Sequence, residues 1–398
     1  MKKTNNSFNA LPVFLAFLCM GFGDLAGPLV SLVKDSFNLN NFQAFLTTFS
    51  GFIMFGLLSI PMGVLQDRKG KKLIMNMGLI IAFIGLIIPI VNGMYGPGID
   101  MTGAGENSFF ILLLSILILG AGATTLQVVG NPIMRDVSAE GKYSSNLSLA
   151  QSVKAVGSSL GFLLPPIVTA VSDLDWPLLF PVYSVLILIN LILFNSARIE
   201  EKNEDRKEPA TFASCFSLLG NPYVLMMVLA IFLYVGAEVT MSSGVPLLMK
   251  ENFGISEFGL WVSWALFFLP ILAGRFVGGL ILRIFSPKKF FITTVFISII
   301  GLILMFLGIE VLTFIGIILI GLGFANIFPL VFSITIDKMP ERANELSGLM
   351  VTAIVGGAFI PPLMGVVSDM SGSLLMGFTV PLVCLGYIMI TSFAVAKK

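Results

Sequence analysis

The chain has 398 residues, of which 56% are hydrophobic and only 11% are charged, and its formal net charge is +1. A soluble globular domain carries about a quarter charged residues, so this composition excludes a soluble protein and predicts a chain embedded in a lipid bilayer. The chain has no histidine, no glycine-rich phosphate loop with its lysine and no metal-ligand spacing. We therefore expect no enzyme activity, no cofactor, no metal and no nucleic-acid partner.

Apolar stretches follow one another along the whole chain, bounded by charged residues, glycine and proline. A stretch of about 20 residues is long enough to cross the hydrocarbon core as a helix. About twelve such stretches occur, at 11–33, 43–65, 73–92, 109–134, 146–170, 177–197, 221–249, 258–283, 289–309, 312–335, 347–367 and 375–396. The sequence therefore predicts an all-α membrane protein with twelve transmembrane helices.

The distribution of lysine and arginine predicts the orientation. With a cytoplasmic N-terminus, all but four of the 23 cationic residues fall on cytoplasmic segments. Lys34 and Lys250 fall outside, and Lys154 and Arg275 lie within spans. Cytoplasmic loops carry the excess of positive charge in membrane proteins. We therefore predict a multi-pass protein of the cell (inner) membrane with both termini in the cytoplasm.

Spans 1 and 7 each carry a carboxylate about midway along their length, Asp24 and Glu238. A charge at that depth costs roughly 2.5–3.5 kcal/mol, so an acid at the same place in both halves indicates function. Shortly after each acid, Lys34-Asp35 recurs as Lys250-Glu251. Since the chain has no histidine, coupling to protons must use carboxylates, and we predict Asp24 and Glu238 as the proton-coupling residues.

Several polar side chains inside the spans have the chemistry to bind sugar hydroxyls. Amides also hold membrane helices together, and Asp24 with Lys154 could instead form a structural ion pair. Glu238 could bond a neighbouring helix, and Arg275 could extend its side chain to the membrane surface. The predicted substrate-binding residues are Asp24, Gln127, Asn131, Gln151, Lys154, Glu238 and Asn326.

One polar connection and one repeat predict the domain organisation. The mixed-charge segment 198–213 cannot be inserted in a membrane and is typical of a solvated linker. Pro165-Pro166 with Ser172-Asp173 recurs as Pro361-Pro362 with Ser368-Asp369, which makes spans 5 and 11 counterparts. We predict an N-terminal six-helix bundle at 1–197, a cytoplasmic linker at 198–220 and a C-terminal six-helix bundle at 221–398.

A loop predicted between spans 2 and 3, at 63–72, carries a sequence motif. It resembles the G-x-L-x-D-R-x-G signature of the major facilitator superfamily, with Gly63, Asp67, Arg68 and Gly70 at the matching positions. The glycines allow a tight turn and close helix approach. The resemblance implies the major facilitator fold, with two pseudo-symmetric six-helix bundles, and a gating role for this motif. We also expect a monomer in contact with membrane lipid.

Further segments resemble the fucose–galactose–glucose proton symporters of that superfamily. They include 234–238 in span 7, 274–278 in span 8, 328–333 in span 10, and Asn131 with the proline after it in span 4. The resemblance implies proton-coupled import of a sugar that binds between the two halves. The chain departs from the family at Gln127, where a glutamate is frequent, at Lys154, where asparagine is usual, and at Asp24, which precedes the usual carboxylate position by one turn. Two alternatives stay open: symport of a sugar acid with Lys154 as counter-ion, and proton-coupled export of drugs or metabolites.

Overall fold

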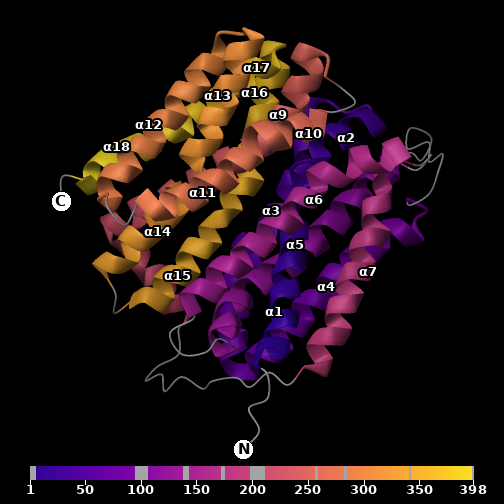
Figure 1. Cartoon of the computed structure of the whole chain (residues 1–398), viewed down its shortest axis with the longest axis vertical. Helices are drawn as coiled ribbons and strands as arrows, with labels where there is room; N and C mark the ends of the chain where they lie inside the picture. Colours follow the sequence, from indigo (N-terminus) through magenta and orange to yellow (C-terminus); the bar gives the residue numbers. More distant parts are fainter. Residues whose placement is uncertain are drawn as a thin grey trace, which may run out of the picture. The chain divides into compact units, whose positions relative to one another are not determined.

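The protein is described here from a computed structural model that covers residues 6–94, 106–137, 143–171, 175–197, 211–255, 259–281, 285–339 and 342–396. Within these ranges all regular secondary structure is helical (Figure 1). Residues 198–210 of the predicted linker 198–220 lie outside the described residues.

The long helices coincide with the predicted spans. In the part of the chain that the structure describes, ten helices are long and apolar enough to cross a membrane, and the interrupted first span raises the number to eleven. The predicted span 146–170 coincides with α6 (Tyr143–Val171), whose described apolar part is Ser152–Val168. In the described residues each predicted span therefore falls on one helix or on a run of consecutive helices, and the all-helical architecture is confirmed.

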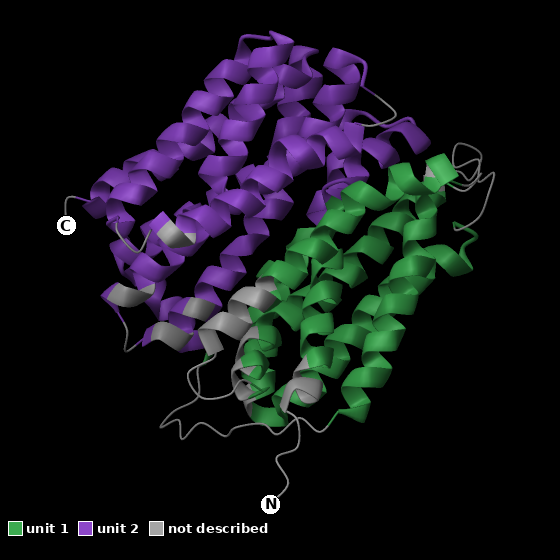
Figure 2. Cartoon of the chain, viewed as in Figure 1, with its two compact units in different colours: residues 1–26, 50–211 green, residues 27–49, 212–398 purple. Residues whose placement is uncertain are grey.

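The chain forms two compact units (Figure 2). Unit 1 contains residues 1–26 and 50–211, and unit 2 contains residues 27–49 and 212–398. Residues 27–49 belong to the predicted N-terminal bundle but pack with the C-terminal part of the chain, and residues 212–220 of the predicted linker belong to unit 2. The segment 27–49 holds the second half of span 1 and the beginning of span 2.

Unit 1 is built from long helices that pack side by side. α4 packs along α5, and α1 packs against α5, α6 and α7. Its core includes a stacked pair of rings, Phe22 and Tyr183, with centroids 4.1 Å apart. The elements are α1 (Asn6–Met20), η1 (Gly21–Ala26), the larger part of α3 (Asn41–Lys69), α4 (Lys71–Val91), α5 (Glu106–Val137), α6, η2 (Trp176–Leu178) and α7 (Leu179–Ser196).

Unit 2 is organised around α9 (Pro222–Phe253), which packs against α14, α16 and α18. Before α9 lie α2 (Leu29–Ser36), the start of α3, α8 (Phe212–Ser217) and η3 (Leu218–Gly220). After it lie α10 (Gly259–Ser263), a π-helical turn η4 (Trp264–Phe268), α11 (Leu269–Ile281), α12 (Pro287–Phe306), α13 (Glu310–Phe324), α14 (Ile327–Lys338), α15 (Ala343–Thr352), η6 (Ala353–Val355), α16 (Gly356–Ser371), α17 (Leu374–Gly377) and α18 (Thr379–Ala396).

Local sequence explains where α9 begins and ends. The Asn221 side chain accepts a hydrogen bond from the backbone N–H of Tyr223 at 2.9 Å, and Pro222 occupies the first helical position, where no N–H is needed. The helix ends at Gly254, which adopts a left-handed conformation with φ 67°. Lys250 in the last turn complements the negative end of the helix dipole. These signals delimit a 32-residue helix that carries Glu238.

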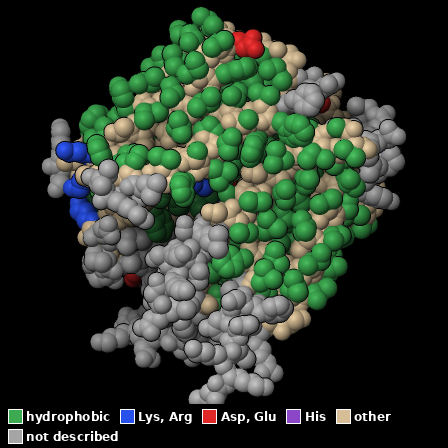
Figure 3. Space-filling view, in the orientation of Figure 1, with side chains coloured by type: hydrophobic (Ala, Val, Ile, Leu, Met, Phe, Trp, Pro, Cys, Tyr) green, Lys and Arg blue, Asp and Glu red, His purple; other side chains and the backbone are tan. Residues whose placement is uncertain are grey.

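The outer surface of the helices is apolar. Hydrophobic side chains cover most of the face seen in Figure 3, and few charged side chains interrupt them. Val91, Phe276 and Val383 are 81%, 75% and 74% exposed. Such a surface would be costly in water, whereas in a bilayer these side chains contact lipid.

Candidate functional site

The first span is interrupted where Asp24 lies. α1 ends at Met20, and the chain continues as the 3-10 turn η1 before Gly27 and Pro28 lead into α2. A 3-10 segment within a helix leaves backbone groups without their usual partners, and interrupted helices form binding sites in several transporter folds. Asp24 is therefore placed at a discontinuity of its span, in unit 1.

Two residues of α6 hold the Asp24 carboxylate. Ser158 Oγ donates to Asp24 Oδ2 at 2.6 Å, and Lys154 Nζ lies 3.7 Å from the same oxygen. The first contact has the length of a charge-assisted hydrogen bond, while the second is an ion pair longer than a hydrogen bond. The side chains of Lys154 and Asp24 are 22% and 29% exposed. The two side chains lie within ion-pair distance, as the alternative of a structural pair required, and their roles in coupling and binding stay predictions. Ser158 was missed, although its position one turn after Lys154 puts it on the same helix face.

Close packing of η1 on α6 makes these contacts possible. A Cβ at Gly21 would collide with the carbonyl oxygen of Lys154 and would lie 2.6 Å from the backbone nitrogen of Ser158. The missing side chain at Gly21 therefore lets the two backbones touch. This contact brings Asp24, three residues later, beside the two polar side chains of α6.

Gln127 lies on the face of α5 that packs against η1. Ala123, one turn before it, packs directly on Gly23, the neighbour of Asp24. The side-chain oxygen Oε1 of Gln127 is buried and accepts no hydrogen bond from any described residue. An unsatisfied buried acceptor costs about 1–3 kcal/mol, and binding of a substrate hydroxyl by this oxygen stays a prediction.

Three predicted site residues have side chains outside the described part of the structure. Asn131 lies on α5, Gln151 on α6 and Asp67 on α3. Their roles in substrate binding and gating stay predictions.

The segment 63–72 is not a loop, contrary to prediction. Gly63 and the exposed Arg68 belong to the end of α3, and α4 begins at Lys71. Only Gly70 is non-helical, with φ 90° and ψ 153°. A side chain is strained in that conformation, so one glycine is sufficient to turn the chain between the two helices.

Unit 2 contains a second carboxylate–cation pair, on different helices. Arg275 of α11 lies with Nη2 3.5 Å from Glu238 Oε1 of α9, and the side chains are 46% and 23% exposed. Tyr234, one turn before Glu238, lies beside both residues. The two segments 234–238 and 274–278, which the sequence singled out separately, therefore meet at one place. We had not predicted Arg275 as the partner of Glu238.

The same cluster holds the interruption of span 10. Helices α13 and α14 are separated at Ala325 and Asn326. Tyr234 donates to the Phe324 carbonyl at 2.9 Å, and Arg275 Nε donates to the Ala325 carbonyl at 3.4 Å. The Asn326 amide donates to the Gly274 carbonyl at 2.8 Å. Asn326 therefore connects helices, and substrate binding by this residue stays a prediction.

Comparison with known proteins identifies the family. The model of the Major Facilitator Superfamily matches residues 13–362. The chain belongs to this superfamily. It is thus a multi-pass secondary transporter of small molecules and not an enzyme.

Named relatives of this major facilitator protein cover nearly its whole length. A glucose/galactose transporter of Brucella abortus (strain 2308) is 27% identical over 96% of this chain and 93% of the relative. The L-fucose-proton symporter of Escherichia coli (strain K12) is 25% identical over 96% of this chain and 91% of its own length.

Solved structures show the same fold. The crystal structure of FucP in the outward conformation matches with a TM-score of 0.67 and 22% identity, over 97% of this chain and 98% of that one. A bacterial homologue of the lysosomal transporter Spinster, inward-facing and occupied, matches with a TM-score of 0.75 and 16% identity, over 100% of this chain and 98% of that one.

Proposed function

We propose that this transporter imports a sugar or a sugar derivative together with protons, by alternating access, in the inner membrane with both termini in the cytoplasm. The names of the relatives support the class of substrate. The orientation is supported by the cations, nearly all of which fall on one side of the predicted topology. The observation that carries the coupling role is the partly exposed Asp24 carboxylate at the interruption of span 1.

Asp24 is suited to bind and release a proton. In its ionised form the carboxylate accepts the short Ser158 hydrogen bond and is attracted by Lys154. Protonation removes the attraction to Lys154 and lowers the cost of keeping the acid in a water-poor site. Lys154 is then released to bind the sugar, beside the Gln127 oxygen, which accepts no hydrogen bond from a described residue. Proton binding at Asp24 thus promotes substrate binding at Lys154 and Gln127, and all three residues belong to unit 1.

Uptake into liposomes with an imposed inward proton gradient tests the proposal. The panel contains neutral hexoses, amino sugars and sugar acids. Asp24→Asn should abolish uphill accumulation but preserve substrate binding and exchange, because the amide keeps the shape and cannot cycle a proton. Glu310→Gln, which removes the exposed carboxylate at the start of α13, is the matched control and should transport normally. If Asp24→Asn still concentrates the substrate, the coupling site lies elsewhere, and Glu238 is the next residue to examine.

A sugar acid is the second candidate substrate. Lys154 Nζ makes no hydrogen bond to any described residue and is partly exposed, so its three donors can meet an anion. Binding restricted to sugar acids, lost in Lys154→Ala and kept in Lys154→Arg, would establish this substrate. Proton-driven efflux of a drug or metabolite with no sugar uptake would instead overturn import.

A further inference from the structure

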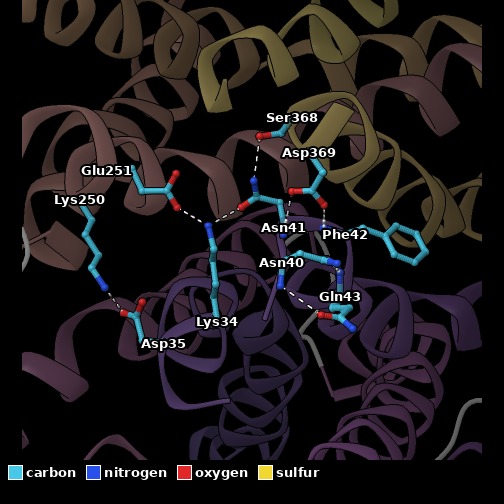
Figure 4. A network of polar contacts seen from close by, with 10 residues as sticks. All are labelled: Lys34, Asp35, Asn40, Asn41, Phe42, Gln43, Lys250, Glu251, Ser368 and Asp369. Atoms are coloured by element: carbon cyan, nitrogen blue, oxygen red, sulfur yellow. Dashed lines mark hydrogen bonds and ion pairs between the residues drawn. The ribbon is translucent and has the colours of Figure 1, made fainter. Parts of the chain in front are cut away.

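Two ion pairs connect α2 with the end of α9 in a reciprocal pattern. Lys34 pairs with Glu251, and Lys250 pairs with Asp35 (Figure 4). The first residue of each dipeptide thus binds the second residue of the other. The recurrence of Lys-Asp as Lys-Glu in the sequence is explained by this pairing, since two copies of such a dipeptide are complementary to each other. All four residues belong to unit 2.

A second set of contacts connects the beginning of α3 with α16. The Asp369 carboxylate accepts hydrogen bonds from the backbone N–H groups of Asn41 and Phe42, at 3.1 and 2.8 Å. This carboxylate caps the N-terminus of α3, where donors are free and negative charge is favoured. The Asn41 amide also donates to Ser368 Oγ at 3.0 Å and accepts from Lys34 Nζ at 2.6 Å. The ion pairs and the cap therefore form one network (Figure 4).

The backbones are in contact beneath this network. A Cβ at Gly365 of α16 would lie 2.8 Å from Phe42 Cα and 2.9 Å from its nitrogen. Real Cβ atoms do not approach backbone so closely. The start of α3 and α16 can close on each other only because residue 365 is glycine.

The ion pairs are accessible to water and therefore easy to break. Lys34 and Glu251 are 20% and 34% exposed, and Lys250 and Asp35 are 39% and 49% exposed. Exposed pairs hold by a modest free energy, whereas breaking a buried pair leaves an uncompensated charge. Contacts of this kind, exposed ion pairs around a glycine contact, can hold two segments together and still separate at a small cost in free energy.

We propose that this network is a releasable clamp that closes one face of the transporter and separates during each transport cycle. It joins residues 34–42, from the first six-span half of the sequence, to residues 250–251 and 365–369 of the second half. Alternating access requires the two halves to separate at the face that opens. Lys34 and Lys250 are the two cations that the predicted topology assigns to the outer side, so the clamp closes the outer face.

The clamp rests on the proposed transport function, but its test needs no substrate. Hydrogen–deuterium exchange is measured by mass spectrometry on the full-length protein in lipid nanodiscs, for peptides that contain residues 40–44 and 248–253. Exchange of protected amides reports the fraction of time that a local region is open. Clamp opening can therefore be detected even if no sugar on the panel is transported.

Two independent perturbations should open the clamp. Gly365→Ala wedges the backbone contact and should speed exchange of these peptides by about tenfold or more. Gly386→Ala is the matched control, because a Cβ there meets no atom within 4 Å, and it should leave exchange unchanged. Loss of one exposed ion pair accounts for about a two- to fivefold change, so the charge reversal Lys34→Glu should give about tenfold. The double variant Lys34→Glu/Glu251→Lys should return exchange to within about twofold of the wild type.

The charge swap keeps the test decisive if Gly365→Ala fails to fold. The proposal is overturned if Lys34→Glu leaves exchange of both peptides unchanged, or if the double variant exchanges as fast as the single one. Faster exchange spread over the whole chain would also overturn it, because it would indicate a static brace whose loss destabilises the fold. Faster exchange confined to the clamp, without transport of any sugar, would support the clamp and contradict only the proposed substrate.

Discussion

Removal of the positive charge beside Asp24 should move the pH dependence of transport. Lys154→Ala deletes the ammonium group that lies 3.7 Å from Asp24 Oδ2 and leaves the Ser158 hydrogen bond in place. Without the cation the ionised carboxylate loses its opposite charge, which favours the neutral acid. The midpoint of proton-driven uptake should therefore shift upward.

The geometry limits the size of this shift. Two unit charges at this separation interact by about 1 kcal/mol in water and about 4 kcal/mol at an effective dielectric constant near 20. Both side chains are partly exposed, at 22% and 29%, which places the interaction in the lower part of that range. An interaction of about 1 kcal/mol is small, so uptake should change gradually with pH and should not be lost altogether.

The assay is initial uptake into liposomes over a series of external pH values, at a constant inward proton gradient. Lys154→Arg keeps the charge and should stay close to the wild type. Ser158→Ala removes the other group that stabilises the ionised acid and should shift the midpoint in the same direction. An unchanged midpoint in Lys154→Ala, or a shift to lower pH, would refute the electrostatic argument. Complete loss of binding of an anionic substrate in Lys154→Ala, with normal binding in Lys154→Arg, would identify Lys154 as a substrate counter-ion instead.

Two further predictions concern the turn after α3 and the cysteine of α8. Gly70→Ala should destabilise the protein by about 1–3 kcal/mol, because an alanine at φ 90° is strained, and thermal unfolding should show a lower Tm than Gly386→Ala. Burial, followed by the negative charge of Glu345, raises the pKa of the Cys215 thiol. Glu345→Gln should lower that pKa and increase the thiolate fraction, so alkylation of Cys215 at mildly alkaline pH should accelerate, measured with the other two cysteines replaced by serine. An equal or slower alkylation rate would contradict the role of Glu345.

Sequence composition and spacing were sufficient for the architecture. A span must be long and apolar to satisfy its backbone in lipid, so each membrane helix leaves a strong local signal. For the same reason Asp24 and Glu238 stood out, since a charge is rare at that depth. The pairing of Asp24 with Lys154 was also predictable, because few charges in the spans are available as partners.

Contacts between distant segments had no comparable signal. Ser158 and Arg275 were not chosen as partners of the two acids, because serine is common in membrane helices and an arginine can extend to the surface. The sequence did not predict that residues 63–69 are helical, because charged residues and glycines are also typical of loops. The roles of Gly21 and Gly365 depend on the backbone that lies opposite them, and nothing local in the sequence reveals a neighbour.

The sequence by itself determined the membrane helices, the family motif and the acids within the spans, because hydrophobic length and intramembrane charge are local properties. The repeated Lys-Asp and Lys-Glu dipeptides were also visible, but as a repeat without a purpose. Only the tertiary structure decided that the two dipeptides bind each other, that Asp369 caps α3, and that residues 27–49 pack with the C-terminal part of the chain. Those contacts join segments that are far apart in the sequence. Which helices lie side by side depends on packing over the whole fold, and no local stretch of sequence specifies it.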